Sequence, residues 1–310
     1  MNRLKIVFMG TPDFAVPCLE TLVKTEDVKA VFTQPDKPKG RGFKMIPTPV
    51  KVSALEYNIP VYQPKSLRKC EDAENSMQIL REINPDLIVV TAYGQILPKE
   101  VLELPKYGCI NIHASLLPKY RGAAPIQWCI LNGEKKTGVT SMQMDIGLDT
   151  GDMLVKRETD IGENETSAEL FERLAEMGGE VLAETIEKIK SDSLEPVKQD
   201  DSLSSYSPMI SKEMSRLDFS KSAQEIHNII RGITGFTMLD GKRLKIYRSS
   251  LTGEYSTAQN GEIADLKNFG VKCGDGQIIR FEEIQLEGSK RMETSAFLRG
   301  KKLEKGCILG

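Results

Sequence analysis

The sequence is poor in histidine and tryptophan, with two and one among 310 residues. The histidines, His113 and His227, lie far apart, and the six cysteines are scattered without a Cys-x-x-Cys pair. Because zinc sites need such close spacing, we predict no metal site, and free, mostly buried thiols. The sequence also lacks the Gly-x-Gly-x-x-Gly and Walker patterns, so it gives no support for a dinucleotide or triphosphate site.

Long apolar runs are also missing. A membrane-spanning helix needs about 18 consecutive apolar residues, and no stretch of the sequence approaches this length. The apolar start, residues 4–9, is too short for a secretory signal and is typical of a first strand. We therefore expect a cytoplasmic protein without membrane contact.

The chain has little net charge, −2, but the charge is unevenly distributed along it. Residues 208–310 hold 17 Lys and Arg against 13 Asp and Glu, a net charge of +4, whereas residues 1–207 hold 25 against 31, a net charge of −6. A basic C-terminal part is compatible with an anionic partner, although ordinary fluctuation would also explain so small an excess.

The first 190 residues alternate short apolar runs with amphipathic stretches. Strands are predicted at residues 4–9, 28–33, 60–62, 87–90, 108–112, 139–144 and 153–156, and helices at 13–23, 49–57, 76–83, 124–131 and 166–190. Thr166 and Glu169 form a capping box at the start of the last helix. This alternation predicts an α/β fold, a Rossmann-like, doubly wound, mostly parallel sheet in a domain of residues 1–190.

The remaining residues change in character. Residues 191–207 are polar and without apolar periodicity, which predicts a linker. Residues 208–310 contain one short helix, 222–230, followed by strand-like runs separated by Gly and Asp turns. This pattern predicts a small OB-like β-barrel domain. His227, inside the short helix, is expected to be a surface or half-buried residue without a functional role.

One pair of residues stands out as a candidate for chemistry. Asn111 and His113 end a predicted strand and, two residues apart, project to the same side. Open α/β sheets bind ligands at this edge. An amide donor beside an imidazole suits acyl transfer, because both can stabilise a developing oxyanion.

A histidine in this role needs a carboxylate partner, and the loop of residues 144–152 offers three, Asp145, Asp149 and Asp152. Residue chemistry alone leaves the choice among them open. The alternative for the strand end itself is hydrogen bonding to its own loop.

The segment of residues 34–51 is unusually basic. It holds Lys37, Lys39, Arg41, Lys44 and Lys51 against one acid, with four prolines and a single aromatic residue. Such a composition is typical of a mobile loop that contacts a phosphate backbone. A solvated surface loop is the alternative.

These motifs together resemble the methionyl-tRNA formyltransferase family. The resemblance is carried by residues 8–14 (FMGTPDF), the basic segment around 40–42, 92–98 (AYGQILP), 111–118 (NIHASLLP) and 147–152 (GLDTGD), and it extends over essentially the whole chain. The Asn, His and Ser-Leu-Leu-Pro motif with the later Asp is shared by the folate-dependent formyltransferases. The first motif and the basic loop are more specific to the tRNA enzymes.

The resemblance implies roles for individual residues. The catalytic residues would be Asn111, His113 and Asp149. The walls of the folate site would be formed by Ser115, Leu116, Leu117, Pro118, Gln95, Ile96 and Leu97. Arg41, with Lys39 and Lys44, would seat the tRNA acceptor end.

The resemblance also implies the two substrates and the oligomeric state. The one-carbon donor would be 10-formyltetrahydrofolate as a co-substrate, the acceptor would be initiator methionyl-tRNA, and no metal would take part. The domain of residues 208–310 would bind tRNA, and we expect a monomer.

The sequence departs from the family pattern in its C-terminal part. The segment after Ile230, Arg231 and Gly232 is short and lacks the usual Pro and Trp, and Leu217-Asp218-Phe219 replaces the common Ile-Asp-Trp. The alternatives are a formyltransferase for glycinamide ribonucleotide or an amino-sugar nucleotide, a hydrolase of the formyl-folate, or a non-enzymatic RNA-binding module. The presence of Asn111, His113 and Asp149 favours the enzyme.

Overall fold

The computed structural model describes residues 3–39 and 44–310. The chain forms two compact units. Unit 1 gathers Met1–Gly122, Thr137–Thr159 and Phe171–Tyr206, and unit 2 gathers Ala123–Lys136, Asp160–Leu170 and Ser207–Gly310. Among the described residues, no helix combines the length and the apolar character that a membrane span requires.

A seven-stranded sheet forms the centre of unit 1, in the order β10-β9-β7-β6-β1-β2-β5. The run from β7 to β5 is parallel, and β9 pairs with β7 in the antiparallel sense. The predicted mostly parallel sheet is therefore confirmed. Its strands are β1 (Lys5–Gly10), β2 (Asp27–Phe32), β5 (Val61–Tyr62), β6 (Leu87–Thr91), β7 (Cys109–His113), β9 (Lys136–Gln143) and β10 (Met153–Asp160).

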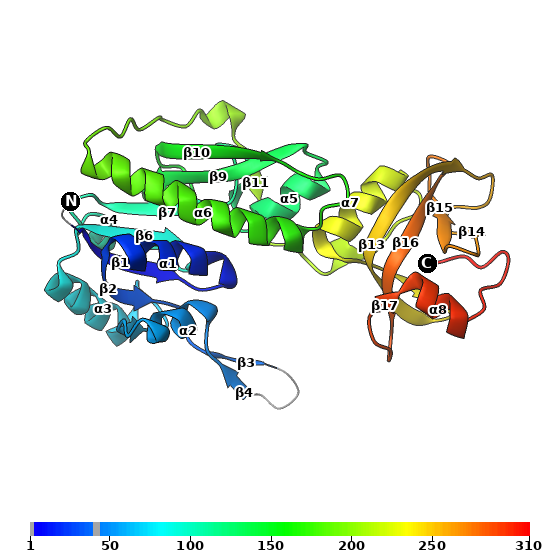
Figure 1. The fold of residues 1–310 in the computed structure, drawn as a ribbon, viewed down its shortest axis with the longest axis horizontal. Coiled ribbons are helices and arrows are strands. Elements are labelled where there is room, and N and C mark those ends of the chain that lie inside the picture. Colours follow the sequence, from blue (N-terminus) through cyan, green and yellow to red (C-terminus); the bar gives the residue numbers. More distant parts are fainter. Residues whose placement is uncertain (1–2, 40–43) are drawn as a thin grey trace. The chain divides into compact units, whose positions relative to one another are not determined.

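Helices cover both faces of this sheet, which explains why the strands are apolar along their whole length. Alternate residues of β1 point to opposite faces, and Val7 and Met9 pack with residues of α3 (Cys70–Ile83) and α4 (Lys99–Leu102). On the other face, α1 (Val16–Thr25) and α6 (Ser167–Lys190) lie side by side (Figure 1). Gly178 brings α6 close to both Cys18 and Ile112.

The start of α6 has the predicted capping box. The backbone N–H of Glu169 donates to Oγ1 of Thr166 at 3.4 Å, and the Thr166 N–H donates back to Oε2 of Glu169 at 2.9 Å. The bond from the Thr166 N–H contributes most to lowering the pKa of the Glu169 carboxyl to about 2, with further bonds from Arg248 and the Thr166 hydroxyl.

The basic segment is more ordered in its arms than expected. β3 (Lys37–Lys39) and β4 (Lys44–Ile46) pair as an antiparallel hairpin, and α2 (Pro49–Glu56) begins directly after it (Figure 1). The prediction of a loop throughout is therefore wrong for these two arms, because Pro38 lies where the ladder tolerates it, in an edge hairpin. Arg41 lies outside the described residues.

Unit 2 is built on an antiparallel sheet, in the order β12-β13-β16-β15-β14 with β17 paired to β16. This confirms the predicted C-terminal β-sheet domain, although unit 2 also takes in residues 123–136 and 160–170. Its core contains Phe219, Phe269 and Phe281. Its elements are α5 (Pro125–Leu131), η3 (Glu213–Ser215), α7 (Ala223–Ile233), β12 (Gly235–Leu239), β13 (Lys242–Tyr255), β14 (Ile263–Asp265), β15 (Gly270–Lys272), β16 (Gln277–Leu286), β17 (Met292–Glu293) and α8 (Thr294–Gly300).

Three polar residues of α7, His227, Asn228 and Arg231, are buried, contrary to the expectation for His227. The His227 side chain bonds Oγ of Ser249 at 2.9 Å and the Glu163 carbonyl at 3.1 Å, and the whole residue is 2% exposed. Burial is the largest cause of its lowered pKa. Arg231 is also buried and donates to the carbonyl of Gly162 at 3.2 Å. Both side chains fix the loop before α6 within unit 2.

The segment predicted as a linker makes regular contacts with the sheet of unit 1. Val197 forms an antiparallel bridge with Met153, and a short helix, η2 (Asp201–Leu203), follows. The segment then runs into β11 (Tyr206–Ser207), which pairs with β8 (Arg121–Gly122). The polar composition therefore reflects an exposed surface rather than a free tether.

Candidate active site

Asn111 and His113 lie at the C-terminal end of β7, beside the parallel strand β6. Two residues apart on a strand, they project to the same side as predicted. His113 is 6% exposed, and Asn111 is half-buried. The pair therefore stands at the sheet edge where open α/β folds bind their ligands.

Both ring nitrogens of His113 face oxygen atoms. Nε2 lies 2.9 Å from the carbonyl oxygen of Tyr120, and Nδ1 lies 3.7 Å from Oδ2 of Asp149. Because a carbonyl oxygen can only accept, Nε2 carries the proton of that hydrogen bond. Nδ1 is the nitrogen that faces the carboxylate, at an ion-pair distance that is too long for a hydrogen bond.

Asp149 is the carboxylate that completes the group. Its Oδ1 accepts a hydrogen bond from Nδ2 of Asn111 at 3.4 Å, and its Oδ2 accepts one from the backbone N–H of Gly122 at 2.8 Å. Asp149 itself has a positive φ of 54°, a conformation that Asp tolerates better than most residues. The structure thus brings Asn111, His113 and Asp149 together.

The other two aspartates of the loop have different surroundings. Oδ1 of Asp145 accepts from the Gly147 N–H at 3.0 Å and from Thr150 Oγ1 at 2.7 Å, so it shapes the turn. Asp152 is exposed, and its carbonyl pairs with the Gln143 N–H. Of the three aspartates that the sequence left as alternatives, Asp149 is therefore the one that faces Asn111 and His113.

Gly151 fixes the end of this loop against the sheet. A Cβ at Gly151 would lie 1.7 Å from the carbonyl oxygen of Gln143, which no side chain can satisfy. The glycine thus allows the loop backbone to reach β9 and to return Asp149 towards β7.

Residues 115–118, which follow β7, form one wall of the candidate site at the sheet edge. Oγ of Ser115 donates to the Lys119 carbonyl at 2.7 Å, and the Ser115 carbonyl accepts from Oγ1 of Thr140 at 2.7 Å. Leu117 is fully buried and anchors the segment, whereas Leu116 and Pro118 are half-buried. The Leu117–Pro118 peptide bond is cis.

The segment after β6 lies at the same edge of the sheet. The Gln95 side chain accepts from the Leu67 N–H at 2.9 Å and donates to the Pro64 carbonyl at 2.8 Å, so it supports the loop. Leu97 is buried, but Ile96 is 63% exposed. Of the three residues predicted here, Ile96 offers the largest apolar surface to a ligand.

The described basic residues of segment 34–51 lie in different elements. Lys39 ends β3 and Lys44 begins β4, in register with each other. Lys51 is held instead within unit 1, where its Nζ lies 2.7 Å from Oδ2 of Asp36 and 2.7 Å from Oε1 of Gln63. Its charge is therefore neutralised locally.

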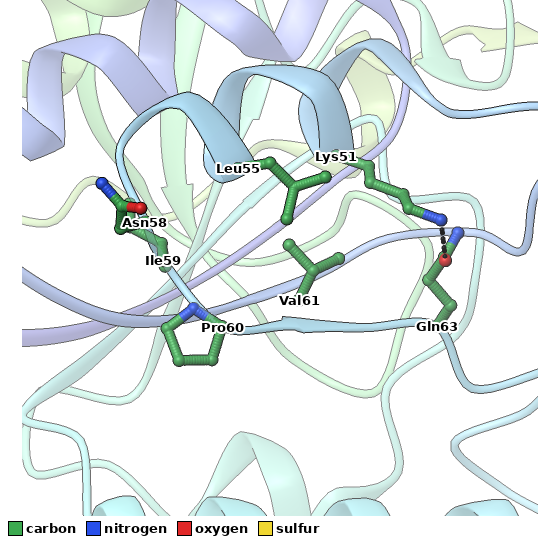
Figure 2. Close-up of a pocket in the computed structure, with 7 residues that line it drawn as sticks. All are labelled: Lys51, Leu55, Asn58, Ile59, Pro60, Val61 and Gln63. Carbon is green, nitrogen blue, oxygen red and sulfur yellow. Dashed lines mark hydrogen bonds between the residues drawn. The ribbon is translucent and has the colours of Figure 1, made fainter.

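A separate hollow of about 470 Å³ lies between α2 and β5. Figure 2 shows Leu55 and Val61 facing each other, with the Lys51–Gln63 hydrogen bond at one end. None of the residues predicted for catalysis lines this hollow, so it is distinct from the group around His113.

Two buried cysteines of unit 1, Cys18 and Cys109, have thiols that are poor nucleophiles. Burial raises the pKa of the Cys18 and Cys109 thiols to about 12. Thiols at this pKa stay protonated and unreactive at neutral pH. Within the described ranges, no three His, Cys, Asp or Glu side chains gather as a metal site would require.

The sequence did not reveal two features of the site. One is the Gly122 N–H, a backbone group that carries no side-chain signal. The other is Gln199, which is 6% exposed and donates to the carbonyls of Asp149 and Gly151. Gln199 lies in a polar segment without motif, so only the fold could associate it with the loop.

Comparisons with known proteins agree with this geometry. The family model described as formyl transferase matches residues 4–186, and the model of the formyl transferase C-terminal domain matches residues 209–302. A solved sugar 3N-formyl transferase, WlaRD, in the presence of dTDP and 5-N-formyl-THF, is 25% identical, with a TM-score of 0.68 over 94% of this chain and 100% of that chain.

The curated relatives are more similar and cover the full length. The methionyl-tRNA formyltransferase of Clostridium novyi (strain NT) is 52% identical over 99% of this chain and 100% of that protein. That of Geobacter metallireducens is 52% identical over 100% of both. With both family models matched in order and these relatives aligned end to end, the chain belongs to the formyl transferase family, and within it to the methionyl-tRNA formyltransferases.

Proposed function

We propose that this protein transfers the formyl group of 10-formyltetrahydrofolate to the amino group of methionine on initiator tRNA, which gives N-formylmethionyl-tRNA for translation initiation. One observation carries the proposal. Asn111, His113 and Asp149 meet at the C-terminal edge of the sheet in a chain about half identical to methionyl-tRNA formyltransferases along its whole length.

The chemistry requires a neutral amine and a stabilised oxyanion. The methionyl nitrogen forms a bond to the formyl carbon, the carbonyl oxygen becomes negative, and the bond to N10 of the folate then breaks as N10 gains a proton. Asn111 has two amide hydrogens, of which one is directed to Asp149 and the other is available for the oxyanion. Such a donor in place before the reaction costs no reorganisation.

His113 would contribute a positive charge next to that oxygen. With Nε2 donating to the Tyr120 carbonyl, the reacting nitrogen is Nδ1, which lies near Asp149 and on the strand face that Asn111 shares. A protonated ring would keep its hydrogen bond to the Tyr120 carbonyl and attract the Asp149 carboxylate, whereas a neutral ring would keep only the hydrogen bond. Asp149 would keep the ring charged and oriented, and would pass the amine proton on through water.

Both substrates would bind at this edge of the sheet. The folate would lie against Ile96, Leu116 and Pro118, which are the apolar residues of the two predicted wall segments that are exposed or half-buried. The solved WlaRD structure contains a formyl-folate, which supports this class of co-substrate. Initiator tRNA would contact Arg41, Lys39 and Lys44 with its acceptor end, and unit 2 with its body. We further propose that the protein acts in the cytoplasm as a monomer.

Acceptors other than methionyl-tRNA are less well supported. Sugar formyltransferases share the fold at about a quarter identity, but the curated relatives that match at about half identity are named for methionyl-tRNA. The test is formylation of methionyl initiator tRNA by the purified protein with 10-formyltetrahydrofolate. Glycinamide ribonucleotide and a dTDP-amino sugar serve as competing acceptors. Faster formylation of either competitor would reject the proposed acceptor.

A further inference from the structure

Gln199 connects the two loops that position the catalytic group. Its amide nitrogen Nε2 donates to the Asp149 carbonyl at 2.9 Å and to the Gly151 carbonyl at 2.7 Å. Its amide oxygen Oε1 accepts from Nε of Arg121 at 3.0 Å. An amide nitrogen has two hydrogens and an amide oxygen has none, so these partners fix the orientation of the side chain.

The two loops held in this way are the ones that act on His113 and Asp149. Arg121 lies between Tyr120, whose carbonyl accepts from His113, and Gly122, whose N–H donates to the Asp149 carboxylate. On the other side, Gln199 holds the Asp149 backbone itself, at a residue with a positive φ. Three hydrogen bonds from one buried amide thus set the distance between the two loops.

A second residue of the same segment holds the first loop. Oγ of Ser205 accepts from the Tyr120 N–H at 2.9 Å, and the Ser205 carbonyl accepts from the Arg121 N–H at 2.9 Å. Residues 199–205 therefore contact both loops, although the sequence suggested only a connection between domains. Arg121 also pairs with Asp201, which is largely exposed.

We infer that Gln199 is a positioning residue for the formyl transfer, and that residues 199–205 act as a brace for the catalytic group. The inference rests on the proposed function of Asn111, His113 and Asp149. Displacement of a catalytic group by about 1 Å can reduce the rate by about 100-fold. A brace on both loops limits such displacement, without any contact between Gln199 and the reacting atoms.

The substitution Gln199→Glu tests this inference with little change in volume. The carboxylate can still accept from Arg121, but it can no longer donate to the Asp149 and Gly151 carbonyls and would repel them. We expect kcat to fall by at least about tenfold with KM for both substrates nearly unchanged, because Gln199 is buried and its hydrogen bonds go to the two loops. Gln199→Asn, which keeps the donor but shortens the chain, should retain more activity than Gln199→Glu.

Gln63→Glu is the matched control. Gln63 is also a partly buried glutamine of unit 1, whose Nε2 donates to the Gln34 carbonyl at 2.9 Å and whose Oε1 accepts from Lys51 at 2.7 Å, and it lines the hollow that is distinct from the group around His113. It should lower stability in a similar way but leave kcat within about twofold of the wild type.

Hydrogen exchange at the Gly122 amide gives a readout that needs no activity, because that amide donates to Asp149. Faster exchange in Gln199→Glu but not in Gln63→Glu supports the brace. Unchanged exchange and unchanged kcat in Gln199→Glu, or an equal loss in both variants, would overturn it. If the wild type failed to formylate methionyl-tRNA while the exchange still responded to Gln199→Glu, the proposed function would be wrong and the brace would stand.

Discussion

The backbone N–H of Gly122 donates to Oδ2 of Asp149 at 2.8 Å. That same oxygen lies 3.7 Å from Nδ1 of His113, so the carboxylate is oriented by a main-chain donor before any substrate binds. A backbone donor has no rotamer freedom to lose, which makes it a firm support for an ionised side chain. The first two predictions concern the group that this bond orients.

Asp149→Asn should reduce kcat by about 100-fold or more, because the side chain keeps its shape but no longer carries the charge that faces His113. The Gly122 N–H can still bond the amide oxygen, so the loop should keep its position. Single-turnover formylation of methionyl-tRNA, with folding checked by circular dichroism, measures the effect. A kcat within threefold of the wild type would show that the carboxylate charge is not needed.

Asn111→Ala and His113→Ala should each remove most of the rate, and the double variant should lose far less than the product of the two single losses. The two side chains stabilise one oxyanion together with Asp149, and residues that act as a unit are not additive. A double-mutant cycle on kcat/KM provides the measurement. Strictly multiplicative losses would mean that the residues act in separate steps.

Gly151→Ala should destabilise unit 1 by about 1–3 kcal/mol and lower kcat, since its Cβ would meet the Gln143 carbonyl oxygen at 1.7 Å and force the loop away from β9. Gly300→Ala is the control, because nothing lies within 4 Å of the added carbon. Urea unfolding and formylation rates are compared for both variants. Equal stability in the two would contradict the close approach of the loop to β9.

Acid should weaken unit 2 through His227. Its folded-state pKa is lowered by burial, so the unfolded state binds the proton more readily. The stability that neutral His227 supports is therefore present above the unfolded pKa of about 6.5 and is lost as the pH falls below it. His227→Gln should reduce the slope of unfolding free energy between about pH 7.5 and about pH 5.5. An identical slope in variant and wild type would exclude His227 as its source.

Salt dependence should distinguish the basic residues of segment 34–51. Arg41→Ala should weaken tRNA binding and reduce the slope of log K against log salt by about 0.7–0.9, as expected for one lost phosphate contact. Lys51→Ala should leave the slope unchanged, because Asp36 and Gln63 already hold that charge. Titrations at several salt concentrations test both, and a similar change in slope for Lys51→Ala would refute the assignment.

The sequence predicted the sheet well, because buried parallel strands must be apolar along their whole length and the helices between them show amphipathic spacing. It also placed Asn111 and His113 correctly, since a period of two follows from strand geometry alone. It could not choose among Asp145, Asp149 and Asp152 without a family resemblance. That choice depends on how a loop folds back, which local pattern does not specify.

The remaining differences concern long-range contacts. His227 and Gln199 are buried by segments far from them in the sequence, so no local pattern could predict their partners. The hairpin arms around residues 37–46 were missed for another reason. Pro and Gly lower strand propensity, and only the pairing of Lys37 with Ile46 across the hairpin reveals the ladder.

The way the chain is divided between the two units limits which fragments of this protein keep their native contacts. The backbone alternates between the units, so residues 160–170 belong to unit 2 although they precede most of α6. A fragment that starts at residue 208 would keep α7 but lose the Glu163 carbonyl that His227 contacts and the Gly162 carbonyl that Arg231 contacts. The imidazole would keep its bond to Ser249 and the guanidinium its bonds to Asn228, but each would lose a backbone acceptor and the segment that covers it, which destabilises the fragment. An exchange of the C-terminal part between relatives therefore has to include residues 160–170 as well.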